Sequence, residues 1–338
     1  MKLELEHKRR ALSESPADET GRALLSVVVP AYNEQDGLAE FHRRLLRVLD
    51  GLELEAEVIY VNDGSHDNTV GVLRALQEAD PRVAFADLSR NFGKEIAMTA
   101  GLDRARGNAV VVIDADLQDP PELIPELVKE WRGGYDVVYA KRSSRTGESV
   151  SKKLSAYLFY RLMKRMSGIE IPEDTGDFRL LSRRAVDALK QLRERHRYNK
   201  GLFAWIGYPQ KAVLYKRDPR FAGTTKWNYW KLWNFAIEGI TSFTTAPLKV
   251  ATYLGFATAC GAFVYAMEVI VKTLIYGNPV SGYPSLMVVI LFLGGIQLLA
   301  IGIIGEYLGR MFDESKQRPL YLVKDYEPAK CQPWRSGG

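Results

Sequence analysis

Cysteine is scarce in this chain: Cys260 and Cys331 are the two among 338 residues. Cys260 lies in an apolar run and Cys331 near the end, so the sequence contains no disulfide framework, which favours a reducing compartment. An apolar segment is also missing from residues 1–22, which are polar and charged. Its absence excludes a secretory signal peptide in that stretch and predicts a loose N-terminal arm.

Two phosphate-binding patterns are absent as well. No Gly-x-Gly-x-x-Gly follows the first predicted strand and no Gly-Lys-Ser/Thr loop occurs, which disfavours a dinucleotide dehydrogenase and an ATPase. A large charge excess is missing too, because the net charge is only +5. That small excess is compatible with anionic lipid headgroups or phosphates as partners.

Short apolar runs alternate with amphipathic segments through residues 24–140. The runs predict strands at 24–29, 56–61, 83–88, 109–113 and 136–140. The intervening segments predict helices at 37–49, 67–79, 95–104 and 121–131. Such alternation predicts βαβ units and a parallel sheet. Right-handed crossovers then place the carboxyl ends of the strands, and the polar residues that follow them, along one edge.

Two carboxylates, Asp114 and Asp116, follow the apolar strand 109–113. In open α/β sheets, ligands bind beyond the carboxyl ends of the strands. Two carboxylates cannot both stay ionised and buried there without a cation, and Mg²⁺ or Mn²⁺ takes oxygen ligands while keeping positions open for phosphate oxygens. The pair therefore predicts a metal–diphosphate site. A polar strand end before the helix that begins at Pro121 is the alternative.

The other strand ends bring polar residues to the same crevice, namely residues 30–34, Asp63, residues 91–94, and Lys141 with Arg142. Asp63 can accept hydrogen bonds from a nucleobase or ribose, or it is a turn residue in Asn-Asp-Gly-Ser. Glu34 can bind ribose, or it favours the start of a helix. Arg142 can neutralise a phosphate, or it belongs to a solvated surface pair.

Four motifs, in order along the chain, resemble those of glycosyltransferase family 2, whose fold is GT-A: residues 27–34, 62–65, 114–122 and 174–180. Over about residues 24–320 the chain is similar to the polyprenyl-phosphate glycosyltransferases, which include dolichyl-phosphate mannose synthases and bactoprenol glucosyltransferases with a C-terminal transmembrane hairpin. The resemblance implies a Rossmann-like α/β domain with a mostly parallel sheet. It also implies an inverting transfer of a sugar from a nucleotide sugar to a lipid phosphate.

The resemblance assigns roles on the donor side. The residues that it implies for binding the nucleotide sugar are Pro30, Tyr32, Glu34, Asp63, Lys94, Asp114, Ala115 and Gln118. Asp114, Asp116 and Gln118 would hold Mg²⁺ or Mn²⁺ together with the diphosphate. Asn62 stands where many members carry Asp, which leaves the pyrimidine contact to Asp63 and bears on the preference for the base.

On the acceptor side, the polar segment 143–155 predicts a mobile cover that passes into a helix at 152–167. In the family this loop helps to hold the acceptor phosphate, which makes Arg142, Lys152 and Lys153 candidates. The stretch from Arg220 to Lys226 resembles the family's Arg-x-x-Gly-x-x-Lys loop, whose Arg and Lys would contact the phosphates. The predicted catalytic residues are Asp116, Asp177, Arg142 and Arg220.

Asp177 follows Gly176, a residue type that permits close approach of the backbone. An acidic group opposite the metal can orient the acceptor or take a proton, although a lipid phosphate is already largely ionised near neutral pH. Capping of a helix at 183–192 is the alternative role for Asp177.

Residues 193–231 are basic and aromatic, which ahead of a membrane segment indicates a belt at headgroup level rather than a nucleic-acid site. Residues 227–245 predict an amphipathic interfacial helix. Two apolar runs follow, 246–275 and 286–304, and a membrane span needs about 20 such residues. Flanking basic residues place both chain ends and the catalytic domain in the cytoplasm. Glycines in the second run allow helix packing and a homo-oligomer.

The predicted organisation is an N-terminal arm (1–22), a GT-A domain (23–226), an interfacial helix (227–245), a transmembrane hairpin (246–309) and a cytoplasmic tail (310–338). The predicted function is transfer of a hexose to polyprenyl phosphate on the cytoplasmic face of the inner membrane, with glucose and UDP favoured. Two alternatives stay open. One is a processive polysaccharide synthase, for which two spans offer no polymer channel, and the other is a non-catalytic partner of a sugar or lipid translocator.

Overall fold

The sheet has eight strands in the order β7-β5-β6-β4-β1-β2-β3-β8. The computed structural model describes residues 23–143, 175–195, 197–215, 244–277 and 282–330. The strands are β1 (Leu24–Ala31), β2 (Glu55–Asn62), β3 (Val83–Leu88), β4 (Ala109–Val112), β5 (Val137–Arg142), β6 (Thr175–Ser182), β7 (Gln210–Tyr215) and β8 (Val323–Glu327). Only β6 and β8 run antiparallel to their neighbours in this described sheet. The predicted mostly parallel α/β fold is confirmed.

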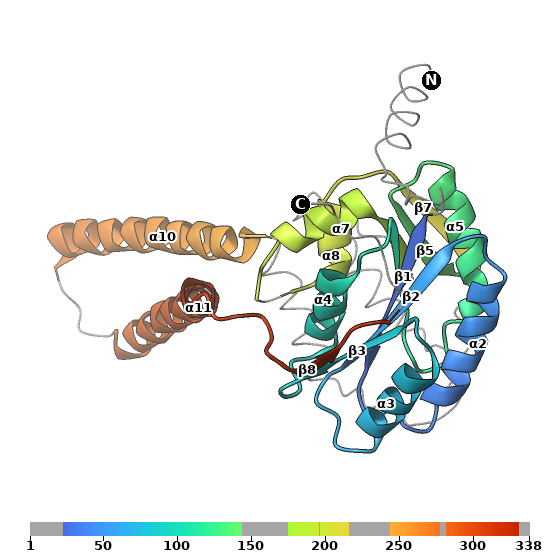
Figure 1. Ribbon diagram of the computed structural model, residues 1–338. Helices are drawn as coiled ribbons and strands as arrows, with labels where there is room; N and C mark the ends of the chain where they lie inside the picture. Colours follow the sequence, from blue (N-terminus) through green and yellow to red (C-terminus); the bar gives the residue numbers. More distant parts are fainter. Residues whose placement is uncertain (1–22, 144–174, 196, 216–243, 278–281, 331–338) are drawn as a thin grey trace, which may run out of the picture.

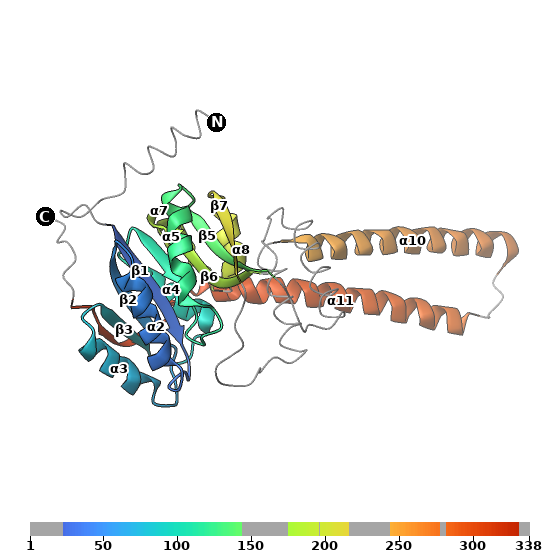
Figure 2. The same cartoon turned by 90° about the vertical axis from the view of Figure 1, so that its right-hand side faces the viewer.

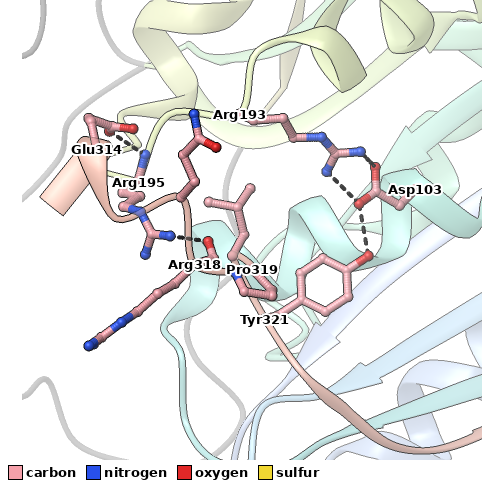
Figure 3. A pocket seen from close by; sticks show the side chains of 9 residues that line it. Asp103, Arg193, Arg195, Glu314, Arg318, Pro319 and Tyr321 are labelled. Carbon is pink, nitrogen blue, oxygen red and sulfur yellow. Dashed lines mark hydrogen bonds and ion pairs between the residues drawn. The ribbon is translucent and has the colours of Figure 1, made fainter.

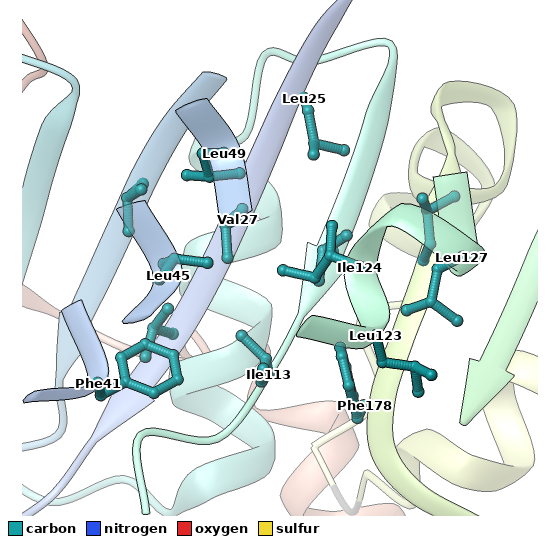
Figure 4. Packing of buried hydrophobic residues seen from close by; sticks show 14 of the residues in the cluster. Leu25, Val27, Phe41, Leu45, Leu49, Ile113, Leu123, Ile124, Leu127 and Phe178 are labelled. Carbon is teal, nitrogen blue, oxygen red and sulfur yellow. The ribbon is translucent and has the colours of Figure 1, made fainter. Parts of the chain in front are cut away.

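Two layers of helices cover the two faces of the sheet (Figure 1). One layer holds α2 (Leu38–Asp50), α3 (Thr69–Ala79), the short helix η1 (Pro121–Leu123) and α5 (Ile124–Arg132), and the other holds α4 (Lys94–Arg104), α7 (Arg183–Gln191) and α8 (Asn199–Trp205). Side chains alternate across a strand, so Val27 of β1 packs in the first layer and Val28 in the second. Figure 4 shows the first layer, in which Phe41 and Leu45 of α2 pack beside Val27.

Helix α4 lies unusually close to the sheet because of Gly101. A Cβ at that position would stand 2.2 Å from Cγ1 of Val28 and 3.2 Å from Cγ2 of Val61. Only glycine leaves room for this approach. The helix begins at Lys94, directly after the loop that follows β3, so its first turn lies at the carboxyl edge of the sheet.

Strand β6 enters the sheet between β4 and β5, antiparallel to both. Its first residue, Thr175, pairs with Lys141 at the end of β5, while its last, Ser182, pairs with Ala109 at the start of β4. The reversed direction brings Asp177 to the carboxyl edge. Ser182 caps α7 by accepting a hydrogen bond from the amide of Ala185. Asp177 is therefore not the cap of that helix, which removes the alternative role left open by its spacing.

Two long apolar helices extend away from the domain (Figure 2). They are α10 (Ala246–Tyr276) and α11 (Tyr283–Ser315), and their segments Pro247–Tyr276 and Val288–Ser315 are long and apolar enough to cross a membrane. Two of the three charged residues in α10 pair with each other, since Lys272 Nζ lies 2.5 Å from Glu268 Oε1. Pairing at a spacing of four residues lowers the cost of these charges in an apolar segment.

After α11 the chain returns to the sheet as strand β8, which the sequence pattern did not predict. Strand β8 pairs antiparallel with β3 and covers its edge. Arg74 of α3 forms an ion pair with Asp325 at 3.2 Å, and the amide of Ser89 donates to the carbonyl of Leu322 at 2.9 Å. The residues of β8 alternate between half-buried and exposed, and several of them are charged. No apolar run in the sequence therefore marks this strand. The pairing depends on the free edge of β3.

Candidate functional site

The predicted metal-binding segment leaves β4 as a tight loop. Ala115 and Leu117 are buried in it, whereas Asp114, Asp116 and Gln118 stay partly exposed. Leu117 has a φ of 59°, a left-handed conformation that is uncommon for a residue with a Cβ. The amide of Gln118 donates to Asp116 Oδ1 at 3.1 Å, which holds the turn. The loop thus leaves accessible the three oxygen-bearing side chains that the resemblance implied as ligands.

Lys94 joins the two halves of the site. Its Nζ donates to Asp114 Oδ2 at 2.7 Å and to Asp177 Oδ2 at 2.5 Å. Burial raises the pKa of Asp114 to about 6, despite the lowering effect of the Lys94 charge. Burial would also raise the pKa of Asp177, but the charges of Lys94 and Lys200 outweigh it and hold that pKa below its usual value. Asp177 therefore stays ionised at neutral pH.

Two further cations act on Asp177: Arg179, within the motif at 174–180, and Lys200, within the stretch 193–231 that was predicted as a headgroup belt. Arg179 is buried, donates to the carbonyl of Gly176 at 2.9 Å and stacks over the ring of Phe203 at 3.8 Å. Burial lowers the pKa of Arg179 to about 10. Lys200 donates to the carbonyl of Thr175 at 3.0 Å, and burial lowers its pKa. Arg179 lies on β6 and Lys200 on α8, and no sequence motif includes both residues. Only the fold of the chain brings them together.

Glu95, in the first turn of α4, also lies near Asp177, although no sequence pattern marks it. Burial raises the pKa of its carboxyl group to about 7. Its Oε2 atom is buried without a hydrogen-bond partner, and within the described residues the same holds for only two other side-chain atoms, Arg142 Nε and Asp177 Oδ1. All three belong to the carboxyl edge of the sheet. Buried polar atoms are nearly always hydrogen-bonded in folded proteins. A polar ligand bound at this edge could supply the hydrogen bonds that these three atoms lack.

The far end of β7 supports Arg142. Tyr215 donates from its hydroxyl group to Asp119 Oδ1 at 2.5 Å, and its side chain also hydrogen-bonds Arg142. The ring of Tyr215 meets Phe178 edge to face, with 6.5 Å between centroids. Arg142 is thus held on the side of Asp177 opposite to α4, at the end of β5.

The half of the edge that is predicted to bind the donor consists of two loops, after β1 and β2, that hydrogen-bond to each other. The amide of Asn33 donates to Ser65 Oγ at 2.9 Å, and the amide of Glu34 donates to Thr69 Oγ1 at 3.0 Å. Tyr32 is 40% exposed and meets the ring of His66 edge to face, with centroids 6.4 Å apart. Pro30 is buried in the end of β1. The loops therefore present an accessible aromatic ring beside the carboxyl edge.

Asp63 has a structural task in this half of the site. Its carboxylate accepts from the amides of Phe92 at 2.7 Å and Gly93 at 2.9 Å, and burial raises its pKa. It thereby shapes the loop that leads into Lys94. Next to it, Asn62 donates to Asp87 Oδ1 at 2.7 Å. An aspartate at position 62 would face the carboxylate of Asp87, so the amide avoids a like-charge contact.

Four predicted residues lie outside the described part of the chain: Lys152, Lys153, Arg220 and Lys226. The N-terminal arm, nearly all of the predicted cover at 143–155, the helix at 152–167 and most of the interfacial helix also lie outside it. Within the described ranges, no three His, Cys, Asp or Glu side chains are grouped as metal ligands. The described candidates for a metal are therefore two carboxylates and the amide of Gln118.

Comparisons with known proteins cover most of the chain. The sequence model described as Glycosyl transferase family 2 matches residues 26–190, and the model described as GtrB C-terminal hairpin matches residues 246–311. An uncharacterised glycosyltransferase of Synechocystis sp. is 58% identical over 301 residues, which make up 89% of this chain and 95% of that protein. A bactoprenol glucosyl transferase of Shigella phage SfV is 48% identical over 301 residues, 89% of this chain and 98% of that protein.

Among solved structures, glucosyl-3-phosphoglycerate synthase from Mycobacterium tuberculosis, in complex with Mn²⁺, UDP and phosphoglyceric acid, matches with a TM-score of 0.44. It is 20% identical, and the match covers 70% of this chain and 80% of that chain.

Proposed function

The chain belongs to glycosyltransferase family 2, and on that premise we propose that it transfers a hexose from a nucleotide sugar to polyprenyl phosphate at a membrane surface, with glucose and UDP favoured. The name of the Shigella phage relative, which is matched over nearly its whole length, supports this acceptor and sugar. The match to the hairpin model supports the membrane location. The observation that carries the proposal is the gathering of Glu95 Oε2, Arg142 Nε and Asp177 Oδ1 at one edge without partners among the described residues.

The donor would bind across the loops after β1, β2 and β4. Tyr32 offers an exposed ring and Glu34 a carboxylate beside it, which suit a nucleoside. The diphosphate would lie over the segment from Asp114 to Gln118. Lys94 is the nearest described cation, because its Nζ already contacts Asp114. Asp63 would act mainly by holding the loop that presents Lys94.

The residues present fit a divalent cation. Asp114, Asp116 and Gln118 offer partly exposed oxygen atoms at a strand end, and Mg²⁺ uses one or two carboxylates together with waters and substrate phosphates. Burial raises the pKa of Asp114 to about 6, as expected for a carboxyl group whose ionised form needs a nearby cation. When bound, the cation would stabilise the negative charge that builds on the departing diphosphate.

In the proposed reaction, an oxygen of the lipid phosphate attacks the anomeric carbon of the sugar. The bond from that carbon to the diphosphate breaks, and its electrons leave with the nucleoside diphosphate, so attack from the opposite face inverts the configuration. The acceptor phosphate is largely ionised near neutral pH, and a strong base is not required. Asp177 would orient the acceptor, while Arg142 would donate hydrogen bonds to its phosphate.

The membrane arrangement is part of the same proposal. Residues 23–226 would form the GT-A domain, residues 227–245 an interfacial helix and residues 246–309 the hairpin, with residues 310–338 and the domain on the cytoplasmic side. Arg220, Lys226, Lys152 and Lys153 would complete the phosphate contacts. Glycines at 294, 295, 302, 305 and 309 give α11 small positions at which protomers could pack.

The test is a transfer assay with the full-length protein in detergent or nanodiscs. Release of UDP from UDP-glucose should require polyprenyl phosphate and a divalent cation, and mass spectrometry should find one hexose added to the lipid. The Asp114→Ala/Asp116→Ala double variant should lose this activity, while Asp187→Ala, a change at an exposed carboxylate on α7, should keep it. A panel of other nucleotide sugars identifies the donor. Full activity of the double variant, or activity that survives chelation, contradicts the proposal.

A further inference from the structure

Tyr215, the last residue of β7, lies between two segments that the proposed reaction uses for different substrates. Its hydroxyl group donates to Asp119 Oδ1 at 2.5 Å, and Asp119 belongs to the loop that carries Asp114 and Asp116. The side chain of Tyr215 also hydrogen-bonds Arg142, the last residue of β5. One phenol group therefore links the predicted metal loop to the arginine that is proposed to hold the acceptor phosphate.

The direction of these two hydrogen bonds follows from the donors that are present. A hydroxyl group has one proton, and a guanidinium group has only N–H donors. Tyr215 uses its proton on Asp119, so its oxygen must accept from Arg142. The Nε atom of Arg142 is buried without a partner among the described residues. The bond to Tyr215 therefore comes from a terminal nitrogen of the guanidinium group, and the Nε–H group is left for another acceptor.

The strands keep Tyr215 and Arg142 side by side. The two residues are direct partners in the parallel pairing of β5 with β7, and the amide of Ser143 donates to the carbonyl of Tyr215 at 2.9 Å. Tyr215 is only 6% exposed, and its ring packs edge to face against Phe178 in the core. Backbone pairing and core packing thus fix the hydroxyl group before any substrate binds.

Asp119 anchors the hydroxyl group from inside the site. Its side chain is buried. A Cβ placed on Gly176 would stand 3.7 Å from Asp119 Oδ2, so this carboxylate also lies next to the backbone that leads into Asp177. The bonds from Arg142 through Tyr215 therefore end on a buried group that contacts both the predicted metal loop and the start of β6.

A long arginine side chain has many rotamers to lose when it binds a phosphate. Holding its guanidinium group in place beforehand lowers that cost. We propose that Tyr215 is a positioning residue of the acceptor site, whose hydroxyl group, fixed by Asp119, holds the guanidinium group of Arg142 in the orientation that receives the lipid phosphate. The phosphate then supplies the partner that Arg142 Nε lacks. This inference rests on the acceptor role in the proposed function and adds the residue through which Arg142 is oriented.

A second group of the same chemistry lies away from the transfer site and provides a matched control (Figure 3). There, the hydroxyl group of Tyr321 donates to Asp103 Oδ2 at 2.8 Å and accepts from Arg104 at 3.1 Å. Asp103 lies nine residues after Lys94 in α4, which is about 14 Å along the helix axis. A change of either tyrosine to phenylalanine removes a hydroxyl group between an aspartate and an arginine, but only Tyr215 lies at the carboxyl edge.

The experiment titrates the full-length protein in detergent with farnesyl phosphate, a short acceptor, and separately with UDP and Mg²⁺. Tyr215→Phe should bind farnesyl phosphate about tenfold more weakly, as expected when a hydrogen bond to a charged group is lost, and should bind UDP within about twofold of the wild type. Tyr321→Phe should match the wild type for both ligands. In the transfer assay, Tyr215→Phe should raise the KM for polyprenyl phosphate and leave the KM for UDP-glucose unchanged.

A double-mutant cycle separates positioning from support of the fold, with every titration run well below the thermal unfolding midpoint of the variant. Arg142→Ala should weaken farnesyl phosphate binding by itself, and Tyr215→Phe added to it should cost nothing further, because both changes act through one group. Losses that simply add overturn the inference, as do equal losses in Tyr215→Phe and Tyr321→Phe.

Two other outcomes separate this inference from the proposed function. If Arg142→Ala weakens binding but Tyr215→Phe binds like the wild type, the inference is overturned and the proposed function stands. If Arg142→Ala leaves binding unchanged, or if the wild type does not bind farnesyl phosphate, the proposed acceptor site is contradicted and the inference is overturned with it.

Discussion

Replacement of Asp177 by asparagine isolates the charge at the centre of the site. The side chain keeps its shape and an oxygen that can accept the hydrogen bond from Lys94, now 2.5 Å away, but it loses its negative charge. Lys94 keeps Asp114 as a partner, at 2.7 Å. The substitution therefore changes the electrostatics of the edge without removing a contact.

The cost in stability follows from the exposure of the pair. The side chain of Lys94 is 44% exposed and that of Asp177 is 11% exposed, which places the pair between a surface pair worth about 0–1 kcal/mol and a buried pair whose disruption costs about 3–5 kcal/mol. We expect Asp177→Asn to lower the free energy of unfolding by about 1–2 kcal/mol. The folded pKa of Asp177 is below its ordinary value of 3.8, so this loss should be constant above about pH 5 and should fade as the pH falls below 4.

The cost in activity should be larger. If Asp177 orients the acceptor phosphate, kcat should fall by about 100-fold or more, which corresponds to about 3 kcal/mol of barrier. The assay is UDP release that depends on polyprenyl phosphate, with kcat and the KM for each substrate measured separately. A rise in the KM for UDP-glucose alone would instead indicate that Asp177 acts on the donor.

The control is Asp136→Asn. Asp136 is also buried and paired, with Ser182 and Arg184, but it lies just before β5 at the opposite edge of the sheet, where its partner Ser182 ends β6 five residues after Asp177. That variant should lose stability and keep kcat. If Asp177→Asn keeps kcat within about twofold of the wild type, or if both variants lose it equally, the assignment of Asp177 to the reaction is refuted.

Three further predictions concern other parts of the domain. Glu95→Gln should stabilise the protein above pH 7, because the pKa of Glu95 is about 4.5 in the unfolded chain and about 7 in the folded one. The free energy of unfolding of the wild type therefore falls by on the order of 3 kcal/mol as the pH rises between these values. Denaturation of both proteins at pH 5 and pH 8 should show the difference only at pH 8. Gly101→Ala should cost about 1–3 kcal/mol, because its Cβ would overlap Val28; thermal unfolding measures this loss. A chain that ends at Leu322 should show faster amide exchange in β3, since it lacks the strand that covers that edge.

Much of the domain could be predicted from local pattern. The five apolar runs became β1 to β5, and three of the four predicted helices formed within a residue or two of their expected bounds. The fourth, predicted at 121–131, is divided into the short helix η1 at 121–123 and α5 at 124–132. The reason is that buried parallel strands and amphipathic helices each carry their own periodicity. The polar residues after these strands then had to meet at one edge, because right-handed crossovers leave no other arrangement.

Other parts could not be read from local pattern. Asp177 belongs to one of the family motifs, yet its place near Asp114 depends on β6, which lies antiparallel between β4 and β5. Glu95 looks like an ordinary acid in the first turn of a helix. The carboxyl group of Glu95 is buried because α8 and β6, which come from distant parts of the chain, pack over it, and its Oε2 atom is left without a hydrogen-bond partner there. Spacing alone carries no information about such neighbours.

The sequence by itself determined which segments are strands, helices and membrane candidates, since hydrophobic periodicity is a local property, and its ordered motifs identified the family. The tertiary structure alone decided which charges face each other: Lys94 meets Asp177 across 83 residues of chain, and β8 joins β3 only after the hairpin has been completed. These contacts form between surfaces created by folding, where burial and the field of neighbouring charges set the state of each carboxylate and no short stretch of sequence records the outcome.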